Sequence, residues 1–249
     1  MQSTEWRSML ESAPEVQEIG SQESGVRSQN PGACVVTDLG RMGYGAAFEL
    51  QRSLVEKRKH GEIPDQLLFV EHPHVVTMGR NGHDSNVLAS PELLERAGIE
   101  FHKTDRGGDV TYHGPGQIVG YPIFDLREWK RDVVAYVRGM EQAIIEALAS
   151  SGICGYRDPG ATGVWTDSGK IAAIGVHMSR WVTSHGFALN LETDLNYFGY
   201  IVPCGLTKPV TSMRALGCPA SRNEVIAALE LSFGRVFNRT LFKHNVEKS

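Results

Sequence analysis

Apolar residues recur at helical spacing in two long stretches of the chain. In residues 43–59 the apolar positions fall on one face, and the basic run at 57–59 suits the C-terminal end of a helix. Residues 132–150 carry the longest amphipathic pattern, which Gly152 closes. Both stretches are therefore predicted to be helices.

Two shorter signals mark the starts of further helices. Ser90 followed by Pro91 is typical of an N-cap and a first helical position, and Gly98 ends that helix. Ser221 and Glu224 have the spacing of a capping box, which predicts another helix after Ser221.

Runs rich in β-branched residues predict the strands. They lie at 33–39, 66–71 and 75–79, between glycine loops within 100–126, and at 170–178 and 182–191. We expect the last two to pair as a hairpin through residues 179–181. Because neighbouring strands often lack a helix between them, the pattern favours an α+β fold: a mixed, largely antiparallel sheet with flanking helices.

Composition limits the class of protein. The chain has 249 residues, 41% of them hydrophobic and 22% charged, with a net charge of −4, which fits a globular domain without a general affinity for nucleic acid. Residues 1–30 are polar without apolar periodicity and are expected to form a disordered extension, with a single domain over 31–249. We find neither a membrane-spanning run nor a secretory signal, and expect a cytoplasmic protein.

The densest group of glycines lies in residues 106–117, RGGDVTYHGPGQ. Glycines let the backbone approach a ligand and expose its N–H groups, although the same composition also fits tight turns between strands. Pro115 and the apolar run after it exclude the helix start of a dinucleotide fingerprint, and no phosphate loop is present. A nucleotide site is therefore disfavoured.

Cys204 and Lys170 are candidates for covalent chemistry. Pro203 and Gly205 around Cys204 suit a thiol presented on a loop, although an unpaired cysteine is more often a buried hydrophobe. Lys170 begins a predicted strand, where most lysines are solvated, but an ammonium beside a thiol favours the thiolate. Nothing in their spacing brings the two together.

Six segments, taken in order, resemble one family. They are RGGDVTYHGPGQ (106–117), GVWTDSGKIAAIGV (163–176), RWVTSHGFALN (180–190), DLNYF (194–198), IVPCGL (201–206) and VTSM (210–213), and EHPHVVTMGR (71–80) fits the same pattern. The chain closely resembles the lipoyl(octanoyl) transferase family over most of residues 33–217.

The resemblance implies a biotin/lipoate protein ligase-like catalytic domain. It implies an acyltransferase that moves an octanoyl group from octanoyl-acyl carrier protein to the target lysine of lipoyl domains, the first step of endogenous protein lipoylation. The acceptors are the lipoyl domains of 2-oxoacid dehydrogenase E2 subunits and the glycine cleavage H protein. We expect no cofactor, neither ATP nor a metal ion, and a monomer without nucleic-acid or membrane partners.

The resemblance also assigns roles to residues. Cys204 corresponds to the nucleophile that forms an acyl thioester, and Lys170 to the lysine that lowers the pKa of that thiol. His72 resembles a family histidine near the pocket. The substrate-binding positions correspond to Arg106, Gly107, Gly108, Asp109, Val110, Thr111, Tyr112, His113, Ala173, Ile174, Gly175, Gly186, Phe187 and Ala188.

An acyl chain also needs an apolar slot. Candidates from the predicted hairpin are Ile171, Ala173, Ile174, Phe187 and Leu189. Because side chains alternate along a strand, only one face of each strand can line the slot. The sequence leaves open which face that is.

Three other functions compete with this interpretation. An ATP-dependent lipoate or biotin protein ligase of the same superfamily needs no covalent cysteine. A metal site would draw on His72, His74, His83, His102 and His113, which lack helical ligand spacing. A non-catalytic binding module would not require Cys204 and Lys170.

Docking of an acidic carrier protein calls for a basic surface. Arg127, Lys130 and Arg131 form one candidate cluster, and residues 57–59 form another.

Overall fold

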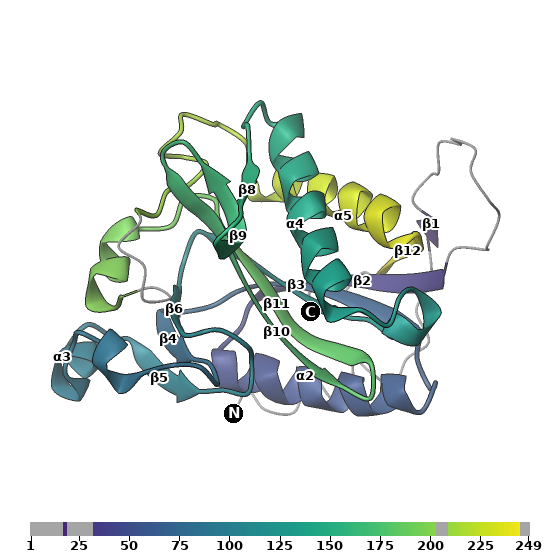
Figure 1. Ribbon diagram of the computed structural model, residues 1–249, viewed down its shortest axis with the longest axis horizontal. Helices are drawn as coiled ribbons and strands as arrows, with labels where there is room; N and C mark the ends of the chain where they lie inside the picture. Colours follow the sequence, from purple (N-terminus) through teal and green to yellow (C-terminus); the bar gives the residue numbers. More distant parts are fainter. Residues whose placement is uncertain (1–16, 19–31, 203–208, 245–249) are drawn as a thin grey trace.

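The computed structural model describes residues 17–18, 32–202 and 209–244. Their strands form a nine-stranded sheet in the order β1-β12-β2-β3-β7-β11-β10-β9-β8 and a three-stranded sheet in the order β5-β4-β6 (Figure 1). The strands are β1 (Gln17–Glu18), β2 (Gly32–Arg41), β3 (Asp65–Glu71), β4 (Val75–Met78), β5 (Glu100–Lys103), β6 (Val110–His113), β7 (Gln117–Ile123), β8 (Tyr156–Asp158), β9 (Ala161–Thr166), β10 (Gly169–Ser179), β11 (Val182–Asn190) and β12 (Arg239–His244).

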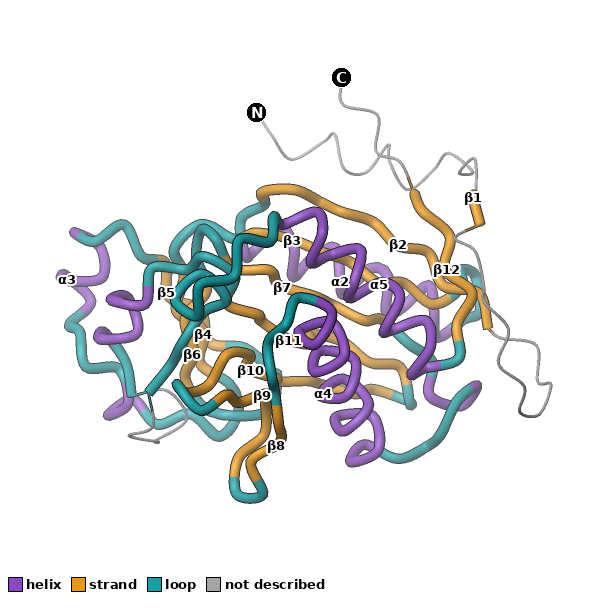
Figure 2. Tube along the Cα trace, turned by 90° about the horizontal axis from the view of Figure 1, so that it is seen from above, coloured by secondary structure: helices purple, strands orange, loops and turns teal. Residues whose placement is uncertain are grey.

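The described residues form four α-helices, three of which cover the two faces of the large sheet. They are α2 (Tyr44–Lys59), α3 (Pro91–Arg96), α4 (Val133–Ser150) and α5 (Arg222–Phe237), with short 3-10 helices η1 (Asp84–Asn86), η2 (Leu126–Glu128) and η3 (Leu195–Tyr200). In Figures 1 and 2, α4 and α5 lie on one face of the large sheet and α2 lies on the other. None of the helices in the described part of the chain is long and apolar enough to cross a membrane.

Alternation along the strands divides the core into two layers. On β3, Leu67 and Phe69 pack with α4 and α5, whereas Leu68 and Val70 pack with α2. A third apolar cluster lies under the small sheet and includes Val110 and Tyr112. The space between the small sheet and the α2 face of the large sheet is where the candidate site lies.

The predicted fold class is confirmed, because most strand pairings are antiparallel while β2 runs parallel to β3 and to β12. The predicted helices are present as α2, α3, α4 and α5. Strands 66–71 and 75–79 are confirmed as β3 and β4, but they belong to different sheets. Strands β8, β9 and β12 were not predicted from the sequence. Gln17–Glu18 pairs with β12, and the rest of the expected extension at 1–30 lies outside the described residues.

The predicted hairpin is confirmed, and a two-residue turn connects its twisted strands. Strands β10 and β11 pair from Ala172 with Leu189 to Ser179 with Val182. Arg180 and Trp181 connect them, with φ values of 53° and 69°. Positive φ at both turn residues matches the right-handed twist of the flanking strands.

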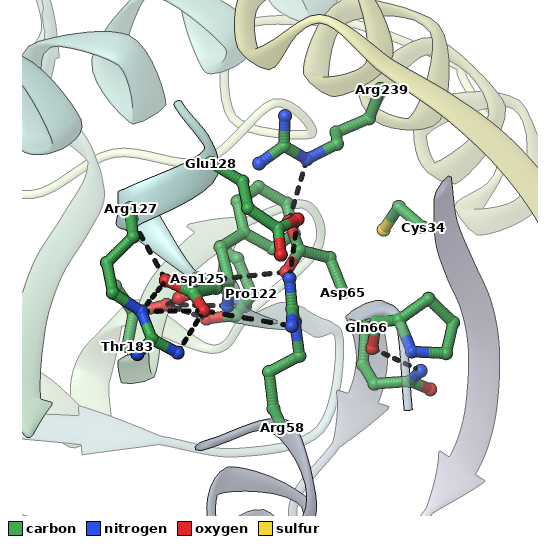
Figure 3. Close-up of polar contacts among 12 residues, drawn as sticks. Cys34, Arg58, Asp65, Gln66, Pro122, Asp125, Arg127, Glu128, Thr183 and Arg239 are labelled. Carbon is green, nitrogen blue, oxygen red and sulfur yellow. Dashed lines mark hydrogen bonds and ion pairs between the residues drawn. The ribbon is translucent and has the colours of Figure 1, made fainter. Parts of the chain in front are cut away.

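A buried ion network ties α2 to the sheet (Figure 3). Asp65 accepts hydrogen bonds from Arg58 Nε at 2.8 Å and from Arg239 Nε at 2.7 Å. Arg58 also pairs with Glu128 at 2.7 Å and with Asp125 at 3.7 Å. Since Arg58 is buried and paired, it is not part of an exposed docking cluster at 57–59.

Candidate active site

Two small cavities lie between β6, α2 and the α2 face of β7, β10 and β11. They have volumes of about 40 and 20 Å³ and share Thr111, Ala173 and Ala188. The larger is lined by Tyr44, Arg106, Gly108, Thr111, His113, Val119, Tyr121, Ala173, Ile174, Gly175, His185, Gly186, Phe187 and Ala188. The smaller adds Gln117, Lys170, Ala172, Asn190, Phe198 and Val210. Because they share these lining residues, the two cavities adjoin, and they are together called the acyl channel, after the apolar slot that the resemblance predicts.

Lys170 lies at one end of the acyl channel and is 8% exposed. Its ammonium lies 5.2 Å from the centre of the Trp165 ring, a distance suited to a cation–π contact. Gly163 makes room for the side chain, because a Cβ there would lie 2.6 Å from Lys170 Cε. The lysine is thus enclosed, unlike the solvated lysine that most strand starts carry.

Backbone hydrogen bonds place Lys170 beside the segment that follows Cys204. Lys170 N–H donates to the carbonyl of Pro209, and Thr211 N–H donates to the carbonyl of Lys170, both at 2.9 Å. Cys204 itself belongs to residues 203–208, outside the described part of the chain. Its expected role therefore stays a prediction.

The glycine-rich segment divides between the acyl channel and the core. Thr111 and His113 line the channel, whereas Val110 and Tyr112 alternate to the opposite side and lie in the apolar cluster under the small sheet. Asp109 also turns away, since its carboxylate accepts hydrogen bonds from His83 N–H and Asn86 Nδ2. Three of the expected substrate-binding positions thus hold the segment in place instead of lining the channel.

The first residues of the same segment support the channel wall. Arg106 Nε donates to Thr77 Oγ1 at 3.1 Å. Its Nη2 donates to the same Oγ1 at 2.9 Å and to the carbonyl of Thr77 at 2.6 Å. Gly107 N–H donates to the carbonyl of Val176 at 2.8 Å. A Cβ on Gly175 would lie 2.8 Å from the carbonyl oxygen of Gly107, so glycine is needed where β10 meets this loop.

The hairpin supplies the long wall of the acyl channel. Ala173 pairs directly with Ala188, and Gly175 pairs with Gly186. These four line the channel as expected from the sequence, and Ile174 and Phe187 border it as well, although their side chains pack toward the core against α4 and α5. Ile171 and Leu189 do not: both are fully buried in the core against α4 and α5. The alternation of the strands therefore settles which face forms the slot.

A chain of hydrogen bonds runs beneath the acyl channel. His113 Nδ1–H donates to Gln117 Oε1 at 2.8 Å, and Gln117 Nε2 donates to Asn190 Oδ1 at 2.9 Å. Asn190 Nδ2 donates to the carbonyl of Thr211 at 2.9 Å. Burial lowers the pKa of His113 to about 3, so the ring is neutral at pH 7 and its Nε2 is an acceptor, 3.5 Å from Thr77 Oγ1.

His72 lies behind the wall of the acyl channel. Its Nδ1 contacts the carbonyl of Met42 at 2.8 Å, and its Nε2 contacts Tyr121 Oη at 2.7 Å. Burial lowers its pKa to about 4. His72 thus orients Tyr121, which lines the channel, while its own ring stays behind it.

The histidines named as a possible metal site have separate partners. His74 contacts Tyr112 Oη at 2.7 Å, and His102 contacts Glu100 at 3.0 Å. Within residues 32–202 and 209–244, no group of three or more His, Cys, Asp and Glu side chains is arranged to hold a metal ion.

Several channel residues were missing from the sequence-based list. Gln117, His185 and Asn190 lie in segments already recognised, so those segments carried the signal. Tyr44 and Tyr121 come from α2 and β7, and only the packing of these elements brings them to the channel.

Comparison with known proteins identifies the class of protein to which this fold and channel belong. Residues 43–234 match the lipoyl protein ligase A/B catalytic domain. An octanoyltransferase of Solibacter usitatus is 63% identical over 82% of this chain and 93% of its own length. One of Koribacter versatilis is 53% identical over 81% and 83%. The chain belongs to the octanoyltransferase family.

Solved structures share the fold. The bi-partite lipoate protein ligase of Thermoplasma acidophilum has a TM-score of 0.69 at 16% identity, covering 87% of this chain and 88% of that one. A lipoate-protein ligase A bound with ATP has a TM-score of 0.65 at 16% identity, covering 88% and 90%. At such identities the likeness concerns the fold alone.

Proposed function

We propose that this protein transfers an octanoyl group from octanoyl-acyl carrier protein to the target lysine of lipoyl domains, through an acyl thioester on Cys204. The acceptors are lipoyl domains of 2-oxoacid dehydrogenase E2 subunits and the glycine cleavage H protein. Membership of the octanoyltransferase family supports the activity. The observation that carries the covalent step is the enclosed Lys170 at one end of the acyl channel.

Lys170 is suited to activating a thiol. A free thiol has a pKa near 8.5, and each unit by which a neighbouring cation lowers it stabilises the thiolate by about 1.4 kcal/mol. An ammonium shielded from water exerts this effect more strongly than an exposed one. The backbone bonds of Lys170 to Pro209 and Thr211 support its proximity to the Cys204 segment.

Two acyl transfers follow. The Cys204 thiolate attacks the thioester carbonyl of the donor, the carbon–sulfur bond to the carrier breaks, and the carrier thiolate takes a proton. The amine of the acceptor lysine then attacks the Cys204 thioester, the amide bond forms, and the Cys204 thiolate leaves. As an ammonium, Lys170 stabilises the attacking thiolate and then gives its proton to the carrier thiolate. The neutral Lys170 takes the proton that the attacking amine loses, which restores the ammonium beside the departing Cys204 thiolate.

The acyl channel binds the hydrocarbon chain. Burying six methylenes contributes on the order of 5 kcal/mol at about 0.8 kcal/mol each. Small side chains at Ala173 and Ala188 leave room over this face of the paired strands. The donor is already an activated thioester, so the reaction proceeds without ATP or a metal ion, in a monomeric cytoplasmic enzyme.

The test is the intact mass of the protein after mixing with octanoyl-acyl carrier protein in the absence of ATP. We expect one added octanoyl group on the wild type and none on Cys204→Ala. Lys170→Met should slow acyl loading at neutral pH, because the thiolate loses its cation, and raising the pH should restore part of the rate. Lys170→Arg, which keeps the charge, is the matched control.

Other results would redirect the assignment. Octanoyl transfer by Cys204→Ala at the wild-type rate would contradict the covalent step. Turnover that requires ATP would identify an ATP-dependent ligase instead.

A further inference from the structure

His185 has an unusual backbone for a residue inside a strand. Its φ is 56°, in the left-handed region, although it lies within β11. Such a conformation costs a non-glycine residue on the order of 1–3 kcal/mol and persists only where surrounding contacts hold it. Residues of this kind cluster at functional sites, so the contacts of His185 indicate what it does.

Three contacts hold His185. Its backbone N–H donates to Gln51 Oε1 at 2.8 Å, and its Nε2–H donates to Asp105 Oδ1 at 2.7 Å. Phe48 stacks on the imidazole, with ring centres 5.4 Å apart and planes inclined by 23°. The side chain is 2% exposed. Both the backbone and the ring are therefore fixed.

The imidazole lies at the end of the acyl channel opposite Lys170. Lys170 and Asn190 line one end, whereas His185, Gly175 and Gly186 line the other. Along β11, Asn190, Ala188 and Gly186 line the two cavities in turn, and His185 precedes Gly186 at the far end.

A larger space lies beyond His185. It is a cleft of about 700 Å³ between α2 and the β10–β11 hairpin. Phe48, Gln51 and Asp105, the three residues that hold His185, all line this cleft, as does Ser184. His185 and Phe48 therefore stand between the acyl channel and the cleft.

We propose that the stacked pair His185–Phe48 is the end wall of the acyl channel and limits the length of the acyl chain that the enzyme accepts. The inference rests on the proposed function, which puts the thioester at the Lys170 end and the tail at the His185 end. Longer chains meet the imidazole, because its hydrogen bond to Asp105 and its stacking on Phe48 prevent it from turning aside. Without the wall, the channel continues into the cleft.

The test compares octanoyl- and dodecanoyl-acyl carrier protein as donors for wild type, His185→Gly and Phe48→Ala. Glycine adopts positive φ without strain, so His185→Gly removes the ring while the strand keeps its path. We expect the ratio of kcat/KM for the dodecanoyl donor to that for the octanoyl donor to rise about tenfold or more in both variants. A tenfold change is the lower end of the discrimination that an apolar pocket achieves for a single methylene. Arg52→Ala is the matched control, since Arg52 lines the cleft without contacting His185, and its ratio should not change.

Direct binding of free dodecanoate, measured by calorimetry, separates this inference from the proposed function. Dodecanoate should bind His185→Gly and Phe48→Ala at least as tightly as octanoate does, whereas wild type should prefer octanoate. An unchanged chain-length preference in both variants, with octanoyl transfer intact, overturns the end wall. Absence of octanoyl transfer in the wild type instead counts against the proposed function.

Discussion

Burial decides the charge of His72 and His113, two histidines beside the acyl channel. The pKa of His72 is lowered to about 4 and that of His113 to about 3, because their rings lie away from water. Both rings therefore stay neutral at a pH where an exposed histidine, with a pKa near 6.5, has begun to bind a proton. Neutral His113 in turn keeps the hydrogen-bond chain to Gln117 and Asn190 in one direction.

These shifts predict the pH dependence of stability. Below about pH 6.5 the unfolded chain binds protons that the folded protein does not, so stability falls with pH until the folded values near 4 and 3 are reached. Each histidine contributes at most about 1.4 kcal/mol per pH unit. We expect the free energy of unfolding, measured with denaturant, to decrease from pH 7 to pH 5 and to decrease less in His113→Gln.

The comparison of His113→Gln with the wild type is clearest above pH 5, where Asp105 does not contribute to the pH dependence. Asp105 has a pKa lowered to about 2 by its hydrogen bond to His185. Its stabilisation is therefore present above about pH 4 and is lost only as pH falls toward 2. A pH dependence of His113→Gln that equals that of the wild type between pH 7 and 5 would contradict the assignment.

The sequence predicted which residues lie at the site better than it predicted which way their side chains point. It singled out Lys170, but its enclosure depends on Gly163 and Trp165, which reach it through the pairing of β9 with β10. It assigned Tyr112 to the substrate, whereas the alternation of β6 sends that ring into the core. Such directions depend on strand register, and one sequence does not define where each strand begins.

At the scale of elements, the sequence predicted a helix start correctly where specific side chains cap the helix. Ser221 accepts a hydrogen bond from Glu224 N–H, and Glu224 bonds back to Ser221 N–H, so the predicted capping box is present at the start of α5. Because the bond satisfies an otherwise unpaired donor, Ser221→Ala should lower the free energy of unfolding by about 1 kcal/mol. Chemical denaturation measures this, and Ser221→Thr, which retains an acceptor, should lose less. Equal loss in both variants would mean that the cap contributes nothing.

The strands that sequence reasoning missed lack such local signals. β8 is three residues long and largely exposed, and β12 follows directly after α5 without a marked apolar run. β12 is a strand because β2 offers it a parallel edge. Likewise β3 and β4 look alike in sequence, and only tertiary pairing assigns them to different sheets.

At the scale of the molecule, Asp65 connects elements that are far apart in sequence. It bonds Arg58 from α2 and Arg239 from β12, and its carboxylate is 1% exposed. Asp65→Asn leaves two buried guanidinium groups with less negative charge, so the free energy of unfolding should fall by about 3–5 kcal/mol.

Glu128→Gln provides the matched control for this network. Glu128 also pairs with Arg58 but is 53% exposed, and exposed pairs contribute about 1 kcal/mol or less. Denaturant unfolding of both variants tests the difference. If Asp65→Asn is as stable as Glu128→Gln, the network does not hold the elements together.

The pairing of β12 with β2 also affects how the chain folds during its synthesis on the ribosome. Arg239 lies beside Gly32, roughly 200 residues apart in sequence, and contacts at such separation form slowly. Until β12 has been synthesised, the edge of β2 that it covers exposes unpaired N–H and C=O groups, a template for pairing with other chains. Completion of the large sheet must therefore follow synthesis of this region instead of accompanying it, and the nascent chain is most exposed to aggregation during that interval.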